Sequence, residues 1–371
     1  MDTDATTDQR ALLDVSTRFM EDACPLQAVR EGRWKEAEHA AAYRRQAGEL
    51  GWFSMLVPES LGGGSVSGDG LVDAALIAYH RGAHLQPGSF VGANVLAFAL
   101  ATAGSDEARE KILPALLAGE APGSWAAPPG DRASTVTARV LDDGGLEISG
   151  TARAVQDVEA STWLLVTCTT DAGPAQAVVS VDAPGVRVVH LDSLDITRRF
   201  ADVRFEELRV PASAVIGTPG EAADLVERQL AIACVLLTAE TVGAMDQDFT
   251  STVQYSKDRI AFGRPIGSFQ GVKHQLADTS MLLEMSKAIT LAAARTVGSG
   301  DDYGPQSASM AKAFVGEAGI DLVQTCFQVY GGIGYTWEHD QHLYLRRVTT
   351  DAGLLGDPAW HREHLCQLAG L

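Results

Sequence analysis

The order of residue patterns along the chain is the feature that most constrains its fold. Residues 1–122 carry apolar residues at helical spacing, residues 123–217 carry short β-branched runs separated by Gly and Asp, and residues 218–371 return to helical spacing. The last region holds four long helical stretches with short links, which predict a bundle. We therefore predict an α+β protein with an N-terminal helical domain, a middle β-sandwich or barrel domain and a C-terminal four-helix bundle.

Size and charge narrow the class of protein and of partner. A chain of 371 residues suits two or three domains, and 46% hydrophobic with 21% charged residues is globular composition. The net charge of −19 repels nucleic acid and anionic lipid, so neither is an expected partner. No uncharged apolar run approaches the roughly 20 residues that a membrane helix needs. The first residues, MDTDATTDQR, do not resemble a secretory signal, so we expect a cytoplasmic protein.

Cysteine and histidine usage argues against a structural metal or disulfide framework. The five cysteines lie far apart and none forms a CxxC pair, which is typical of free thiols in a reducing compartment. His339 and His342 are three residues apart beside acidic neighbours, a pattern more typical of a polar helix start than of a metal site. We expect no metal.

The segment RIAFGRPIGSFQ, from Arg259 to Gln270, joins two long helical stretches. Gly263 and Pro265 break the helix there. A fixed arginine, the aromatic ring of Phe262 and the Gln270 amide around a tight turn can hold a phosphate and contact a base. The alternative is a plain helix–helix turn with a surface arginine.

The segment QVYGGIGYTWEHD begins at Gln328, at the end of another helical stretch. Gly331 and Gly332 allow a ligand to approach the backbone closely and expose amide groups to a pyrophosphate. This is not the dinucleotide fingerprint, because no strand precedes it and the glycine spacing differs. The alternative is a helix C-cap followed by a loop.

Together these segments give the chain a resemblance to the acyl-CoA dehydrogenases. The matching stretches include YSKDRIAFGRPIGSFQGVKHQLAD, QVYGGIGYTWEHDQHLYLRR, LGWFSMLVPESLGGG, ILPALLAGE and LDITRRFADVRFEELRVPASAVIG, and they span roughly residues 45–350. The resemblance implies FAD as cofactor, an acyl-CoA substrate, an electron-transferring flavoprotein as electron acceptor, and a homo- or hetero-oligomer arranged as a dimer of dimers. It also implies contacts to the FAD of a neighbouring subunit from Arg259, Phe262 and Gln270, and contacts to the adenosine end from Gln328, Gly331 and Gly332.

The resemblance further implies a glutamate base that removes the α proton of the thioester while hydride passes to flavin N5. The two positions at which the family carries this glutamate fall on Leu355 and Ala233 here. Glu240 lies seven residues after Ala233, on nearly the same helix face and about 10 Å further along. The chain is similar to steroid side-chain dehydrogenases of two unlike subunits that use a glutamate in this AExxG context. We predict Glu240 as the base, with a structural glutamate paired to an arginine as the alternative; Glu338 and Asp351 are weaker candidates.

The expected flavin-ring site departs from the family pattern. A Thr-Glu-Pro loop is replaced by GSWAAPPG at residues 123–130, and the next strand reads TARAVQD at residues 151–157, without the usual Trp and Thr. Three functions therefore stay open. The first is an active dehydrogenase of a bulky or branched acyl-CoA, the second a non-catalytic subunit completing a partner's FAD site, and the third a flavin oxygenase or oxidase on the same fold.

Overall fold

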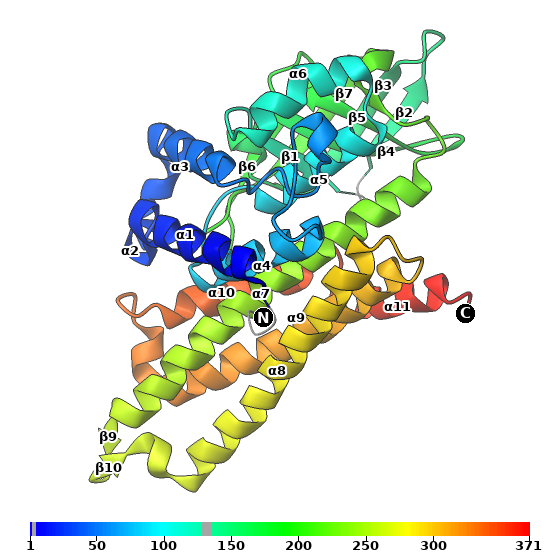
Figure 1. The fold of residues 1–371 in the computed structure, drawn as a ribbon. Coiled ribbons are helices and arrows are strands. Elements are labelled where there is room, and N and C mark those ends of the chain that lie inside the picture. The colour runs from blue at the N-terminus through cyan, green and yellow to red at the C-terminus, as the bar shows by residue number, and fades with distance from the viewer. Residues whose placement is uncertain (2–4, 128–134) are drawn as a thin grey trace.

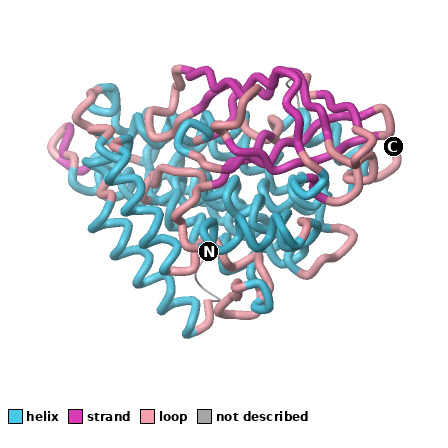
Figure 2. The backbone as a smooth tube through the Cα atoms, turned by 90° about the horizontal axis from the view of Figure 1, so that it is seen from above, coloured by secondary structure: helices cyan, strands magenta, loops and turns pink. Residues whose placement is uncertain are grey.

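The computed structural model describes residue 1, residues 5–127 and residues 135–371, and three regions follow one another along it. A helical region comes first, a sheet second and a bundle of long helices last (Figure 1). Seen from above, the strands gather along one side of the molecule next to the helices (Figure 2). The predicted α+β class with a middle β domain is confirmed. The boundaries at 122/123 and 217/218 stay predictions.

Six α-helices form the described part of the N-terminal region. They are α1 (Thr7–Ala23), α2 (Leu26–Arg30), α3 (Ala37–Glu49), α4 (Gly70–Ala83), α5 (Phe90–Ala103) and α6 (Asp106–Leu117). The hydroxyl of Ser105 accepts a hydrogen bond from Ala108 N and caps α6, so this helix begins where a backbone amide would otherwise lack a partner. Helices α4 and α5 are buried on most of their surface and fill the centre of the larger core.

Among the residues that the structure describes, the middle region forms one sheet of eight strands. They are β1 (Gly123–Ala126), β2 (Thr137–Val140), β3 (Leu146–Gln156), β4 (Trp163–Thr170), β5 (Gly173–Ser180), β6 (Val186–Leu191), β7 (Phe200–Val210) and β8 (Val215–Ile216). Their order is β6-β7-β3-β2-β4-β5-β8, with β1 parallel to β4. Alternate residues of the strands bury a separate core that contains Leu146, Ile148 and Leu164, so the sheet folds around its own apolar face.

The C-terminal region contains five helices. They are α7 (Ala223–Asp258), α8 (Gln270–Gly298), α9 (Gly304–Tyr330), α10 (Gln341–Gly353) and α11 (Pro358–Leu368). The sequence predicted the first four, and α11 is an addition that packs on α9. A short hairpin of β9 (Ile260–Ala261) and β10 (Arg264–Pro265) links α7 to α8. Within the described residues, no helix is both long and apolar enough to span a bilayer.

Two glycines let α4 of the first region cross α7 of the bundle at very short range. A Cβ added to Gly82 would lie 1.8 Å from the carbonyl oxygen of Glu240, and one added to Gly243 would lie 1.8 Å from that of Tyr79. Any larger residue at either position would overlap backbone atoms. The crossing therefore depends on glycine, and it brings the end of α4 against the middle of α7.

Candidate functional site

The hairpin after α7 holds an aromatic side chain out of the molecule. Phe262 and Gly263 have φ values of 51° and 79°, the geometry of a two-residue type I′ turn. Such φ values are uncommon for a bulky residue such as Phe262, which is nevertheless 96% exposed. The Phe269 ring supports it at 6.1 Å between centroids, and the Arg264 guanidinium lies 4.1 Å from the Phe269 ring. An exposed, strained aromatic residue indicates a contact with something outside this chain.

The two predicted cofactor-binding segments lie at the same end of the bundle. Tyr255, one turn before Arg259, packs against Tyr330 at 4.7 Å between ring centroids, and Tyr330 directly precedes Gly331. We call residues 259–270 and 328–335 the bundle tip. Figure 1 shows its hairpin, β9 and β10, at one end of the bundle and away from the larger sheet.

The bundle tip presents the groups that a nucleotide needs. Arg259, Gln270 and Gln328 are exposed. A Cβ added to Gly331 or Gly332 would meet no heavy atom within 4 Å among the described residues, so the backbone there is open to a ligand. A guanidinium, amides, an aromatic face and unobstructed backbone amides fit the phosphates and base of FAD. These six positions were identified from the sequence, and the structure brings them together at the tip; their contact with FAD stays a prediction.

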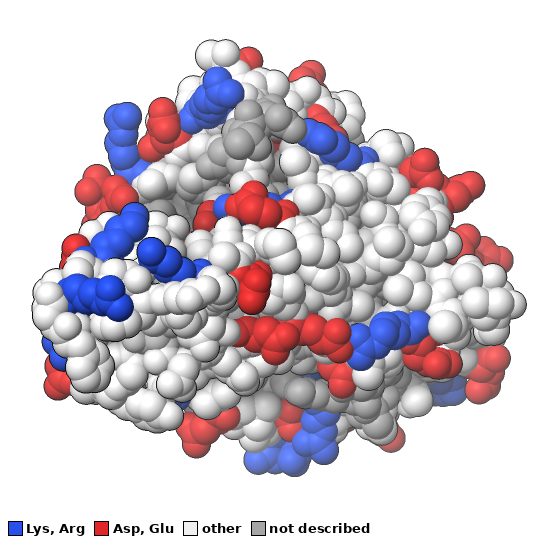
Figure 3. Space-filling model, turned by 90° about the horizontal axis from the view of Figure 1, so that it is seen from below, with Lys and Arg blue, Asp and Glu red and all other residues white. Residues whose placement is uncertain are grey.

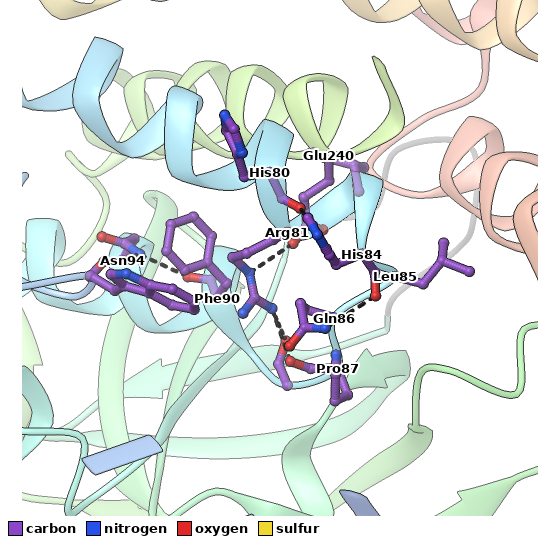
Figure 4. A network of polar contacts seen from close by, with 12 residues as sticks. His80, Arg81, His84, Leu85, Gln86, Pro87, Phe90, Asn94 and Glu240 are labelled. Atoms are coloured by element: carbon purple, nitrogen blue, oxygen red, sulfur yellow. Dashed lines mark hydrogen bonds and ion pairs between the residues drawn. The ribbon is translucent and has the colours of Figure 1, made fainter. Parts of the chain in front are cut away.

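Glu240, the predicted base, lies elsewhere, at the α4–α7 crossing. Its side chain is 1% exposed; Oε1 accepts from Arg81 Nε at 3.2 Å, and Oε2 accepts from Arg198 Nη2 at 2.8 Å. Figure 4 shows Arg81 on its helix directed toward Glu240, with Phe90 and Pro87 nearby. These contacts are those of the alternative, a structural glutamate paired with arginine.

The electrostatics of Glu240 also weigh against proton transfer. Burial raises the pKa of its carboxyl, but the guanidinium groups of Arg198 and Arg81 outweigh burial and hold the pKa below its usual value of 4.5. A general base works best with a pKa near the working pH and a free lone pair directed at the proton. The role of Glu240 as base stays a prediction that its two arginine contacts oppose.

The same ion pairs continue into a buried network that joins all three regions. Arg198 Nη2 lies 2.9 Å from Asp351 Oδ1, and Arg347 Nε lies 2.8 Å from Asp195 Oδ2. Burial raises the pKa of Asp351 to about 6, against the opposing pull of Arg198 and Arg347. We call the six residues the charge network: Arg81, Arg198, Arg347, Asp195, Glu240 and Asp351. Three guanidinium groups face three carboxyl groups in it, so it is balanced when all are ionised.

One histidine contacts Leu355, one of the two positions at which the family carries its base, and Cys234, the residue that follows the other position. His361 Nε2 lies 3.1 Å from Leu355 O and 3.9 Å from the sulfur of Cys234, the neighbour of Ala233. Burial lowers the pKa of His361 to about 3, so its ring is neutral. Leu355 has a φ of 59°, a left-handed conformation between α10 and α11. His361 was not identifiable from the sequence, since a single histidine on a helix carries no local signal.

The other candidates of the sequence are placed as follows. Glu338 is exposed and lies three residues after the bundle tip, and Asp351 belongs to the charge network. His339 contacts the Tyr330 ring at 4.3 Å and His342 stacks on Trp337 at 5.0 Å, which explains both in structural terms. Within the part of the chain that the structure describes, no three His, Cys, Asp or Glu side chains are grouped as metal ligands would be.

The expected flavin-ring segment is described only in part. Residues 128–134, which include the end of the GSWAAPPG loop, lie outside the described residues. Before them, β1 is fully buried, and Trp125 Nε1 donates to Thr167 Oγ1 at 3.2 Å. In the 151–157 strand, Arg153 pairs with Asp202 at 2.5 Å, and Ala154 N donates to the same carboxyl group.

A cavity beside the bundle has an acidic wall. It has a volume of about 910 Å³ and lies between the loop after α3, the start of α7 and the α8–α9 link. Carboxyl groups in its wall are Glu59, Asp224, Glu227, Asp301 and Asp302. Arg228 is the one Arg or Lys among its described lining residues, so the wall disfavours the phosphates of coenzyme A. Seen from below, the surface carries separate acidic and basic groups around broad uncharged areas (Figure 3).

Comparison with known proteins identifies the family. Residues 6–120 match the acyl-CoA dehydrogenase N-terminal domain, and residues 223–367 match its C-terminal domain. The chain is 31% identical over 315 residues to the acyl-CoA dehydrogenase IpdE2 of Mycobacterium tuberculosis (strain ATCC 25618 / H37Rv), covering 84% of this chain and 80% of that one.

Two solved structures share the fold. The Tcur3481-Tcur3483 steroid ACAD has a TM-score of 0.86 at 26% identity and covers 98% of this chain and 97% of its own. PigA with FAD and proline has a TM-score of 0.89 at 20% identity and covers 100% of both chains. The family consists of oxidoreductases that carry FAD. The chain belongs to the acyl-CoA dehydrogenase family.

Proposed function

We propose that this protein is a subunit of an oligomeric, FAD-dependent acyl-CoA dehydrogenase in which the bundle tip binds the nucleotide part of FAD held by a neighbouring subunit. The reaction removes the α proton and the β hydrogen of an acyl-CoA thioester, and bound FAD accepts the latter as hydride. An electron-transferring flavoprotein then takes the electrons. The observation that carries the proposal is the bundle tip, where six predicted positions lie together and face outward.

The geometry of the tip favours a site shared between chains. Phe262 is 96% exposed and its turn stands at the end of the bundle, so the described residues of its own chain cover little of the ring. Burying an exposed phenylalanine is favourable by about 1.5–3 kcal/mol. A cofactor and a second subunit together would bury the Phe262 ring. An arginine contact to phosphate adds a charge-assisted hydrogen bond. Both gains are absent from a single free chain.

A second candidate function is that of the non-catalytic subunit in a complex of unlike chains. The two expected base positions hold Leu355 and Ala233, neither of which can accept a proton. Both carboxylate oxygens of Glu240 accept hydrogen bonds from arginines. In such a complex, the partner would supply the proton acceptor while this chain supplies the bundle tip. The Tcur3481-Tcur3483 steroid ACAD is named after two components, which supports a complex of unlike chains. The word steroid in its name supports an acyl group of steroid-like bulk.

The test compares the chain produced alone with the complex purified from its native host. We expect flavin absorbance in the complex and its anaerobic loss on addition of an acyl-CoA. Arg259→Ala and Phe262→Ala should lower the FAD content of the complex by about tenfold each, since each removes one direct contact. Arg187→Ala, at an exposed arginine on β6, is the matched control and should retain FAD.

The outcomes separate the two candidates. A chain that is yellow alone and bleached by acyl-CoA is the active dehydrogenase. A chain that is colourless alone and gains FAD with a partner is the non-catalytic subunit. Full FAD content in both tip variants would contradict the proposal in either form.

A further inference from the structure

A small cavity lies where the N-terminal helices meet the start of the sheet. It has a volume of about 40 Å³, which is room for a small polar group such as a carboxyl group. Its wall comes from α3 and the residues before it, from the α4–α5 link and from the β domain. We call it the donor cavity and define it by Trp34, His39, Arg44, Asp157 and Arg199, which are among its lining residues.

Three nitrogen atoms at the donor cavity are buried without a hydrogen-bond partner among the described residues. They are Trp34 Nε1, His39 Nε2 and Arg44 Nε, and Trp34 itself is 4% exposed. More than 90% of buried backbone polar groups, and most buried side-chain ones, have a partner in folded proteins. Indole and guanidinium nitrogens can only donate, so the missing partner is a hydrogen-bond acceptor.

The charges around the cavity select an anionic acceptor. The Arg199 guanidinium lies 4.8 Å from the Trp34 ring. Burial lowers the pKa of Arg44, Asp157 opposes this, and Arg199 lowers it further, so Arg44 lies among both signs of charge. Two guanidinium groups face one carboxyl group, that of Asp157, which leaves one positive charge without a counterpart in the cavity wall. A single carboxylate supplies both the charge and the acceptor oxygens.

The cavity is tied to the strand that leads into the expected flavin-ring loop. Pro122 lies in its wall and directly precedes β1. Ser89, also in the wall, donates its hydroxyl to the carbonyl oxygen of Gly123, the first residue of β1, at 2.7 Å. The donor cavity therefore lies at the start of β1, the strand that leads into the expected flavin-ring loop.

We propose that the donor cavity binds the carboxylate at the far end of the acyl group, so that the substrate is the CoA thioester of a dicarboxylic acid. This inference rests on the proposed function. The carboxylate of a free small carboxylic acid has the same chemistry as the carboxylate at the end of an acyl-CoA, so the cavity has two possible ligands. The experiment separates the two ligands.

The experiment uses the FAD-loaded complex and two sets of thioesters, alkyl acyl-CoAs and their ω-carboxy counterparts of equal length. The variants are Trp34→Phe, which keeps an aromatic ring and removes the indole N–H donor, and Arg44→Met, which keeps an unbranched side chain and removes the guanidinium. Trp163→Phe, a tryptophan outside the cavity wall, is the control. We measure kcat/KM for both sets and the Kd of the ω-carboxyacyl-CoA by calorimetry.

The expected result is a preference of the wild type for the ω-carboxy series that falls by about tenfold in both cavity variants, with an equal loss in Kd. Rates with alkyl acyl-CoA and the control variant should not change. Equal rates for both series in the wild type overturn the inference while the proposed function stands. A free dicarboxylate that raises the Tm of the wild type but not of Trp34→Phe, without any preference among thioesters, also overturns it and assigns the cavity to a free acid. Absence of turnover with every thioester contradicts the proposed function. The Kd of the ω-carboxyacyl-CoA in the wild type and in the cavity variants then shows by itself whether the donor cavity binds the carboxylate.

Discussion

Replacing Glu240 with glutamine separates its two possible roles. The substitution keeps the shape of the side chain and removes its charge, which leaves Arg81 and Arg198 buried with fewer partners. Arg81 still donates to Pro87 O at 2.9 Å and stacks on the Phe90 ring, with 4.9 Å to its centroid. Arg198 keeps Asp351 at 2.9 Å.

The magnitude follows from these remaining contacts. Removing one partner of a buried ion pair costs about 3–5 kcal/mol, and the residual contacts place Glu240→Gln at the low end, about 3 kcal/mol. An unfolding entropy of about 2.1 cal/mol/K per residue over 371 residues converts this into a Tm lower by about 4 °C. The conversion applies to unfolding of the whole chain in one transition.

The assay measures Tm and turnover of the same FAD-loaded preparation. We expect the lower Tm together with turnover reduced by less than about tenfold, because the carboxylate has no free oxygen with which to accept a proton. Glu317→Gln is the control, since Glu317 forms an exposed pair with Arg362 that contributes about 0–1 kcal/mol. An unchanged Tm with turnover lowered by orders of magnitude would refute the reasoning and establish Glu240 as the base.

Three further predictions concern other parts of the molecule. Asp351 has a pKa raised from 3.8 to about 6, so its contribution to stability is present below pH 3.8 and is lost as the pH rises through 6. Asp351→Asn should remove that part of the pH dependence of the unfolding free energy, measured by denaturant titrations at pH 4–7. The same dependence of unfolding free energy on pH in the variant and the wild type would contradict this prediction. Gly82→Ala places a Cβ 1.8 Å from a backbone oxygen and should prevent folding or lower the Tm by more than Glu240→Gln does, whereas the same change at Gly271, which has open space and no left-handed backbone, should cost far less. Cys366 is exposed and the other four cysteines are buried, so a thiol reagent should label one cysteine in the native protein and five after denaturation; rapid labelling of a second would show that the folded chain opens.

The order of the structural regions was predictable because each region follows its own local pattern. The β-branched runs of residues 123–217 form strands, and the apolar stretch from Leu230 to Met245 forms the buried half of α7, since period and composition act within a few neighbouring residues. The bundle-tip positions were also accessible, because Gly263, Pro265 and the paired glycines break helices wherever they stand.

The partners of Glu240 were not accessible in the same way. Arg81 lies 159 residues before it and Arg198 lies 42 before it, and both reach it because Gly82 and Gly243 allow two helices to cross at short range. A helix pattern places Glu240 on an apolar face but does not say which cation faces it. The donor cavity was missed for the same reason, since Trp34 and Arg199 come together only after the helices meet the sheet.

The most direct test of the shared cofactor site is a cryo-electron microscopy map of the FAD-loaded oligomer. We predict density for the nucleotide part of FAD against Arg259, Phe262 and the Gly331–Gly332 backbone, with the flavin ring in the adjacent subunit. A map in which these residues face solvent, apart from every FAD and every neighbouring chain, would contradict the account.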